Sequence, residues 1–210
     1  MNDSTGLNIA VIYGSARGNR QGIKAARFLM RKLRERNHTA TLIDPLEVQL
    51  PFLDRMYKEF AEGEAPENMA KISRVLDKAD AFLIVSAEYN HSEPAALKNL
   101  LDHFQSEYLY KPSGIVTYSA GPFGGVRALI TLRAILAELG SPSIPSIFPI
   151  SQVQNAFDDE GNALVEAYER RIGKFLDELE WYGNALKHAR HQDKCAQFSP
   201  MQQGMCRGVS

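Results

Sequence analysis

The sequence predicts an α/β fold in which a five-stranded parallel sheet carries helices on both faces. Five short runs of β-forming residues alternate with five helical patterns, and several of the runs are almost continuously apolar, as strands covered on both faces must be. This alternation implies right-handed crossovers between parallel strands. With 210 residues, 44% of them hydrophobic, the chain can form one domain with a sizeable core.

The elements follow one another in a regular order. We expect strands at residues 7–13, 39–43, 81–85, 113–118 and 143–148. We expect helices at residues 22–36, 67–79, 94–105, 124–139 and 162–186. Residues 1–186 should then form the domain, and the polar residues 187–210 a tail that is mobile or lies on a neighbouring subunit.

Two apolar stretches exceed what a monomer of this size would comfortably expose. Residues 44–66 contain prolines and a glycine that break regular structure, yet they are too apolar for a solvated loop. Together with residues 100–110, they predict the interface of a homodimer or a dimer of dimers. The side chains concerned are Leu50, Phe52, Leu53, Met56, Tyr57, Phe60, Leu100, Leu101, Phe104, Tyr108, Leu109 and Tyr110.

Charge and composition argue against several classes of partner. The chain has 24 basic and 25 acidic residues, so nothing marks a surface for nucleic acid or an anionic membrane. It has no apolar run near the ~20 residues that span a bilayer, and its first residues show neither a basic nor an apolar region of the kind found in signal peptides, so we expect a soluble cytoplasmic protein. His188, His191, Cys195 and Cys206 could supply four zinc ligands, but their irregular spacing is a weak signal and we predict no metal site.

The loop at residues 14–21, between the first strand and the first helix, predicts a phosphate site. Its small residues let the backbone turn sharply and aim N–H groups at an anion, and the next helix adds partial positive charge. Ser15, Arg17 and Asn19 can donate from their side chains. The loop lacks the Gly-Lys-Ser/Thr ending and the three-glycine fingerprint, which favours a phosphomonoester over a nucleoside triphosphate or dinucleotide.

Two further loops should lie beside this one. Residues 86–94 follow the third predicted strand, and residues 119–125 follow the fourth. In open parallel sheets, ligands bind beyond the carboxyl ends of the strands, where the strand order reverses. Each loop taken alone could be an ordinary turn, but the three together predict one binding site.

These three loops resemble the signature segments of the NADPH-dependent FMN reductase family. The resemblance rests on Gly14-Ser15-Ala16-Arg17, on Glu88-Tyr89-Asn90-His91-Ser92 with Pro94 and Leu97-Lys98-Asn99, and on Gly124-Gly125-Val126-Arg127-Ala128. It spans roughly residues 7–180, and it implies a flavodoxin-like, doubly wound sheet of order 2-1-3-4-5 that binds FMN without a covalent bond. Ala87 replaces the usual proline before Glu88, which leaves the second loop less fixed.

The resemblance also implies a role for each loop. In the first, Ser15, Arg17, Asn19 and Gln21 would hold the FMN phosphate, with Gly14 and Arg20 in the same cofactor-binding segment. In the second, Glu88, Tyr89 and Asn90 would offer backbone groups, and Tyr89 its side chain, to the ribityl chain and the ring. In the third, Ser119, Gly121, Gly124 and Gly125 would let the backbone approach the pyrimidine edge of the ring. No catalytic side chain is required, because the cofactor carries the chemistry.

The leading hypothesis is an FMN-dependent NAD(P)H oxidoreductase. Hydride would pass from NADPH or NADH to the flavin and then, in a ping-pong scheme, to a small acceptor such as a quinone, free flavin, azo compound or metal oxyanion. The alternative is a flavodoxin-like electron carrier, which would present an acidic face and a Ser/Thr-rich loop. The balanced charge and Arg17 favour the enzyme. A flavin-sensing interaction protein is a third interpretation, hinted at only by residues 50–60 and the tail.

Overall fold

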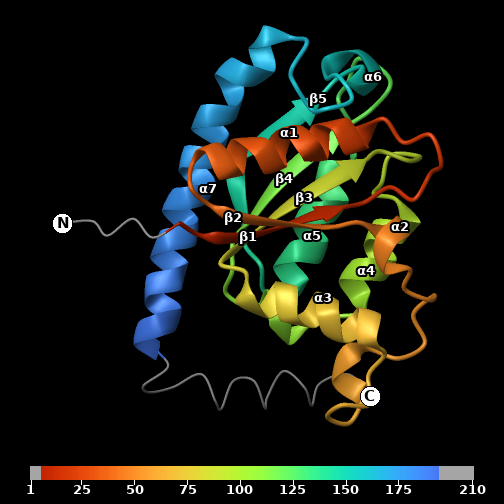
Figure 1. Ribbon diagram of the computed structural model, residues 1–210, viewed down its shortest axis with the longest axis vertical. Helices are drawn as coiled ribbons and strands as arrows, with labels where there is room; N and C mark the ends of the chain where they lie inside the picture. Colours follow the sequence, from red (N-terminus) through yellow and green to blue (C-terminus); the bar gives the residue numbers. More distant parts are fainter. Residues whose placement is uncertain (1–5, 194–210) are drawn as a thin grey trace.

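A parallel sheet of five strands forms the centre of the protein. The structure, a computed structural model, describes residues 6–193. The strands lie in the order β2-β1-β3-β4-β5 (Figure 1), which confirms the predicted flavodoxin-like, doubly wound fold. Their bounds are Asn8–Tyr13 for β1, Thr39–Ile43 for β2, Ala81–Ala87 for β3, Ser113–Tyr118 for β4 and Ser143–Ile150 for β5.

Helices cover both faces of the sheet. One face packs against α1 (Gly22–Glu35), α6 (Val153–Ala156) and α7 (Glu166–Asp193), and the long α7 crosses the sheet on the left of Figure 1. The opposite face packs against α3 (Glu67–Lys78), α4 (Ala95–Asp102) and α5 (Ala128–Glu138). Each face therefore has its own hydrophobic cluster.

The apolar runs of the sequence are explained by this double cover. In β3, Leu83 and Val85 point to the α1 and α7 side, whereas Phe82 and Ile84 point to the α3 and α4 side, and all four are fully buried. Successive side chains of a strand alternate between faces, so a strand covered on both faces needs apolar residues at every position. Each such side chain stabilises the fold by roughly 1.5–3 kcal/mol relative to exposure.

Several element boundaries differ from the sequence expectation. The helix expected from residue 124 begins at Ala128, because Gly124 and Gly125 have φ angles of 66° and 75° and form a turn first. The helix expected to end at residue 186 continues to Asp193. Its added turns are polar and carry no apolar period, and they are held instead by ion pairs from Lys187 and Arg190 to Asp80.

The two apolar stretches predicted to form a subunit interface lie partly in the core and partly at the surface. Leu100, Leu101, Phe104 and Tyr108 are buried in the cluster below the sheet, so the prediction that they form a surface is wrong. Apolar residues have the same helical spacing whether that side of the helix faces the core or forms a stripe at the surface, so the sequence could not distinguish the two cases. The residues after β2 form the short helices α2 (Pro45–Val48) and η1 (Tyr57–Glu59), and a further short helix, η2 (Ser106–Tyr108), follows α4.

Candidate functional site

A groove lies where the loops after β1, β3 and β4 meet. Its volume is about 350 Å³, and it lies at the carboxyl edge of the sheet where the order reverses between β1 and β3. Eight of the predicted residues line it: Ser15, Arg17, Asn19, Arg20, Gln21, Glu88, Tyr89 and Ser119. The predicted residues that do not line it are Gly14, Asn90, Gly121, Gly124 and Gly125.

The first loop leads into a helix whose amino end suits an anion. The N–H group of Gly14 donates to the carbonyl of Val85 at 2.9 Å, which ties the start of the loop to β3. Helix α1 then begins at Gly22 with no side-chain hydrogen bond at its N-cap and no acidic residue in its first turn. The partial positive charge of this helix end is therefore not offset by a carboxylate of its own.

The three arginines near the groove have different partners. Arg20 forms a two-pronged ion pair with the buried Asp44, with Nη2 to Oδ2 at 2.6 Å, and also donates to the carbonyl of Ser15 at 3.1 Å. Arg127 donates from its backbone and its guanidinium to Glu88. Arg17 pairs with no carboxylate in residues 6–193, and its guanidinium lies 5.9 Å from the centre of the Tyr89 ring. Of the three, Arg17 has the charge available for a phosphate.

Ser15 lies beneath the surface of the groove. Its side chain is buried, and its hydroxyl is 2.8 Å from the hydroxyl of Tyr89, which lies above it. The sequence suggested that Ser15 faces the ligand directly. In the structure Ser15 is among the residues that line the groove, with its hydroxyl against that of the half-buried Tyr89, and its contact with a phosphate stays a prediction.

Backbone groups of the second loop are largely paired within the protein. The N–H of Glu88 donates to the carbonyl of Tyr118 at 3.2 Å, and Tyr89 and Ser92 exchange two backbone hydrogen bonds. Between them, Asn90 and His91 adopt φ angles of 52° and 69°, which turn the chain sharply. The N–H groups of Glu88 and Tyr89 therefore already have acceptors within the protein, and the contact of other backbone groups of this loop with FMN stays a prediction.

Packing within the protein itself requires two glycines of the third loop, Gly124 and Gly125. A Cβ on Gly125 would lie 2.7 Å from the carbonyl oxygen of Tyr118, and one on Gly124 would lie 3.0 Å from Pro149. Both residues also have positive φ. Packing of the loop on its own sheet therefore requires glycine at both positions, and the close approach to a flavin ring stays a prediction.

Residues after β5 complete the groove, and the sequence reasoning missed them. The N–H of Gln152 donates to the carbonyl of Gly121 at 3.0 Å, and Ser151 Oγ donates to that of Pro122 at 2.7 Å. This connection fixes the third loop against β5. The lining residues not predicted are Ala87, Tyr118, Ala120, Val153 and Gln154. Applying the same carboxyl-edge rule to the fifth strand would have found the last two.

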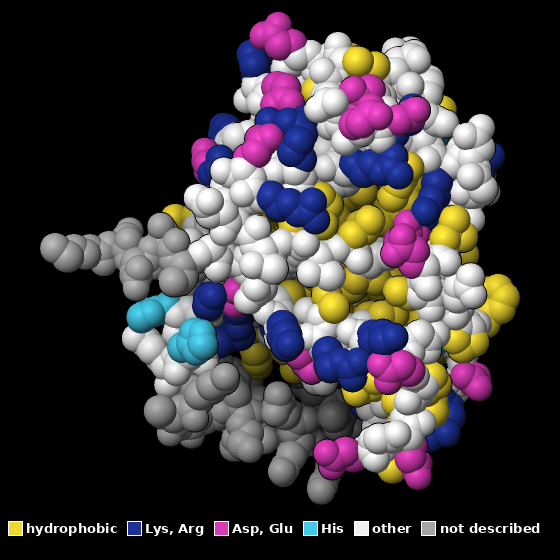
Figure 2. Space-filling view, viewed as in Figure 1, with side chains coloured by type: hydrophobic (Ala, Val, Ile, Leu, Met, Phe, Trp, Pro, Cys, Tyr) yellow, Lys and Arg dark blue, Asp and Glu magenta, His cyan; other side chains and the backbone are white. Residues whose placement is uncertain are grey.

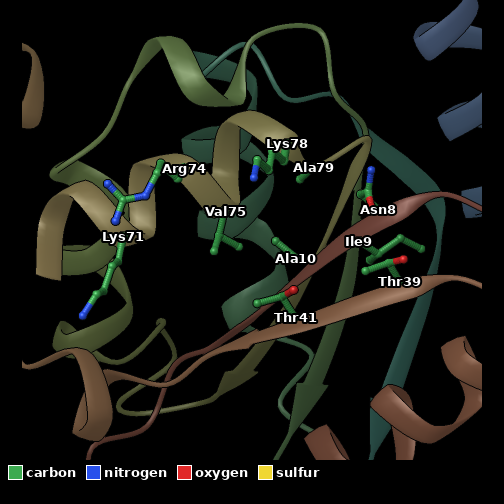
Figure 3. Close-up of a pocket in the computed structure, with 10 residues that line it drawn as sticks. All are labelled: Asn8, Ile9, Ala10, Thr39, Thr41, Lys71, Arg74, Val75, Lys78 and Ala79. Atoms are coloured by element: carbon green, nitrogen blue, oxygen red, sulfur yellow. The ribbon is translucent and has the colours of Figure 1, made fainter.

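A second hollow lies near the amino ends of the strands, between α3 and the pair β1 and β2 (Figure 3). Its floor is formed by Ile9, Ala10 and Val75, and in Figure 3 the side chains of Lys71 and Arg74 point away from it. Both of these cations pair with Glu67. Two of the cations that line this hollow are therefore paired with a carboxylate and directed away from it.

Two sequence expectations concern metal and membrane. Within residues 6–193, no group of three or more His, Cys, Asp or Glu side chains could hold a metal ion. Cys195 and Cys206 lie outside the described residues. No helix of the described chain is both long enough and apolar enough to cross a bilayer.

Several known proteins are similar to this chain over most of its length. A quinone reductase of Pseudomonas putida is 32% identical over 163 residues, which cover 73% of this chain and 83% of that protein. A 2-hydroxy-1,4-benzoquinone reductase of a Burkholderia species is 28% identical, covering 81% and 93%. The solved structure of FerB, a flavoenzyme NAD(P)H:(acceptor) oxidoreductase from Paracoccus denitrificans, superposes with a TM-score of 0.68 at 24% identity, covering 84% and 98%, and shows the same fold.

The family model described as NADPH-dependent FMN reductase matches residues 7–155. These residues include β1 to β5 and all three loops of the groove. The chain therefore belongs to the NADPH-dependent FMN reductase family and is an oxidoreductase that uses FMN and NAD(P)H.

Proposed function

We propose that this protein reduces quinones with NAD(P)H by a ping-pong mechanism, and that the carboxyl-edge groove is its FMN site. The observation that carries the proposal is the groove itself: it lies at the reversal of strand order, next to a helix end without an acidic residue and beside an arginine with no carboxylate partner among residues 6–193. These are the features that a phosphomonoester requires.

The residues present fit FMN. When bound, FMN accepts hydride from a nicotinamide and passes two electrons to a second substrate. Arg17 and the first turn of α1 would hold the phosphate, and Tyr89, which lines the groove, would offer its hydroxyl to the flavin. The Arg20–Asp44 pair holds the loop by its bond to the Ser15 carbonyl, so we assign Arg20 a supporting role and not a phosphate contact.

Quinones are the acceptor class that we favour. The two relatives described above are named as quinone reductases, and an FMN-dependent NADPH-azoreductase of Staphylococcus aureus is 25% identical over 177 residues. The chain has balanced charge and not the acidic docking face of an electron carrier, which also favours a small acceptor over a protein partner. In the ping-pong scheme the oxidised nicotinamide leaves before the acceptor enters.

The spectrum of the FMN-loaded protein tests this function. Anaerobic addition of NADPH or NADH should bleach the flavin absorbance within the time of one turnover, and a benzoquinone added afterwards should restore it. Initial rates at several fixed quinone concentrations should give parallel double-reciprocal lines. No bleaching by either nicotinamide would refute the enzyme and favour the electron carrier.

The site assignment is tested separately by Arg17→Ala. A hydrogen bond to a charged group contributes ~1.5–3 kcal/mol, so FMN should bind roughly 10- to 150-fold more weakly. Riboflavin, which lacks the phosphate, should bind as to the wild type. Arg34→Ala, an exposed arginine at the far end of α1, is the matched control. Equal losses for FMN and riboflavin would remove Arg17 from the phosphate site.

We also propose that a second copy of the chain lies beside the groove. Figure 2 shows hydrophobic side chains at the surface over the segment after α2, where Phe52 is 89% exposed. Phe52, Leu50 and Ala96 line an apolar hollow of about 480 Å³ that reaches Ala16 in the first loop. Light scattering at micromolar concentration should give at least a dimer, and Phe52→Glu should weaken it. A wild-type monomer with full activity would contradict this.

A further inference from the structure

The second loop of the groove contains a tight turn whose two central residues have strained backbone angles. Asn90 and His91 have φ angles of 52° and 69°, in the left-handed region that glycine favours. The residues on either side, Tyr89 and Ser92, exchange two backbone hydrogen bonds of 2.9 and 3.1 Å. Positive φ at both central positions is the property of a type I′ turn, for which Asn-Gly is the favoured sequence. His91 therefore occupies a position where glycine would relieve strain.

A carboxylate holds the end of this turn. Glu93 Oε2 accepts a hydrogen bond from the Ser92 hydroxyl at 2.7 Å and one from the hydroxyl of Thr131, on α5, at 2.6 Å. The Thr131 hydroxyl also lies 3.0 Å from the carbonyl oxygen of Ala128, but the shorter bond to a charged acceptor is the stronger of the two. Burial raises the pKa of Glu93, but hydrogen bonding, chiefly from Thr131 and Ser92, holds that pKa below its usual value. The carboxylate thus stays charged at neutral pH and joins the turn to α5.

This anchor bears on the groove through Tyr89. Tyr89 lines the groove and lies at the start of the turn, where its backbone is paired with the residue at the turn's end. Before the turn, Glu88 accepts hydrogen bonds from Arg127, the N-cap residue of α5. After the turn, Glu93 accepts from Thr131, about one helical turn further along. Relaxation of the strained turn would move Tyr89, and both ends of the loop are held to α5 against it.

We propose that Glu93 and Thr131 are positioning residues that hold the strained turn closed and so keep the Tyr89 hydroxyl in place for bound flavin. Neither residue lines the groove, so both act through Tyr89. The inference rests on the proposed function, since it assumes that flavin occupies this groove. It goes beyond it by assigning a role in binding to a carboxylate and a helix residue outside the groove.

Dissociation constants for FMN and riboflavin, measured by flavin fluorescence on the apoprotein, test this inference. Glu93→Ala and Thr131→Val should each weaken both ligands about 3- to 10-fold, the effect of one misplaced hydrogen bond. Glu93→Gln keeps an acceptor for the two hydroxyls and should stay within about 2-fold of the wild type. Glu138→Ala removes an exposed carboxylate at the end of the same helix and is the matched control.

Two double variants separate positioning from a general loss of stability. Adding Glu93→Ala to Tyr89→Phe should weaken binding no further than Tyr89→Phe alone, because the first change acts through the hydroxyl that the second removes. His91→Gly in the Glu93→Ala background should restore both affinities to within about 2-fold of the wild type. Glycine adopts positive φ without strain, so the turn then stays closed without its anchor.

The outcomes distinguish this inference from the proposed function. Wild-type affinity in Glu93→Ala and Thr131→Val, losses that multiply with that of Tyr89→Phe, or no recovery with His91→Gly would overturn the inference and leave the proposed function intact. Failure of the wild type to bind either flavin would instead refute the proposed function. Urea denaturation of each apoprotein checks folding. If Glu93→Ala does not fold, Thr131→Val gives the same test, since it removes the anchor from the side of α5.

Discussion

The ion pair between Arg20 and Asp44 allows a sharp test of how the first loop is held. The side chain of Asp44 is 2% exposed and that of Arg20 15%, and the two meet through two hydrogen bonds. Asp44 also accepts from the N–H of Leu46, as the N-cap of α2. Hydrogen bonding to Asp44 raises the pKa of Arg20, with burial opposing it, so the guanidinium stays charged.

Arg20→Ala should lower the free energy of unfolding by roughly 3–5 kcal/mol, because it leaves the buried carboxylate of Asp44 without its counter-charge. For a domain of this size, each kcal/mol corresponds to about 2–4 °C in Tm, so the melting temperature of the apoprotein should fall by roughly 6–20 °C. Asp44→Asn in the Arg20→Ala background should restore most of the loss, since the amide is neutral and still caps α2.

Urea and thermal denaturation of the apoprotein measure these effects without the cofactor. Arg17→Ala is the matched control: it lies three residues away in the same loop, is exposed, and should change stability by less than about 0.5 kcal/mol. A loss below about 1 kcal/mol in Arg20→Ala would refute the reasoning. So would equal stability of Arg20→Ala and the double variant, because the cost would then not come from the unpaired charge.

Two further predictions concern charges at the amino edge of the sheet. Burial lowers the pKa of Lys111 to about 8, whereas an unfolded lysine titrates near ~10.4. The unfolded state therefore binds more protons than the folded state between about pH 8 and 10.4. The free energy of unfolding of the wild type should rise with pH relative to that of Lys111→Met, by roughly 3 kcal/mol across that window. A difference between the two proteins that stays constant with pH would contradict this. Lys187→Ala with Arg190→Ala leaves Asp80 only the N–H of Asn8 among the partners described here. This double variant should lower the free energy of unfolding by roughly 1–3 kcal/mol, and adding Asp80→Asn should restore most of that loss. An unchanged denaturation midpoint would show that the end of α7 adds no stability.

The sequence determined the fold and brought residues of three loops together at one candidate groove. Apolar runs that alternate with helical periods allow few arrangements other than a covered parallel sheet, and small or polar residues directly after strands mark its carboxyl edge. Both signals are local in the chain, which is why the amino-acid sequence alone could assign Ser15, Arg17, Glu88, Tyr89 and Ser119 to one groove.

Only the tertiary structure decided what each side chain does there. Arg17, Arg20 and Arg127 look equivalent in sequence. In the structure Arg20 pairs with Asp44 and Arg127 pairs with Glu88, whereas Arg17 pairs with no carboxylate of the described chain. Likewise, helical spacing could not tell that Phe104 and Tyr108 face the core. The reason is physical: a pattern reports which face of an element is apolar, but ion pairs and burial depend on residues tens of positions away that the fold brings together.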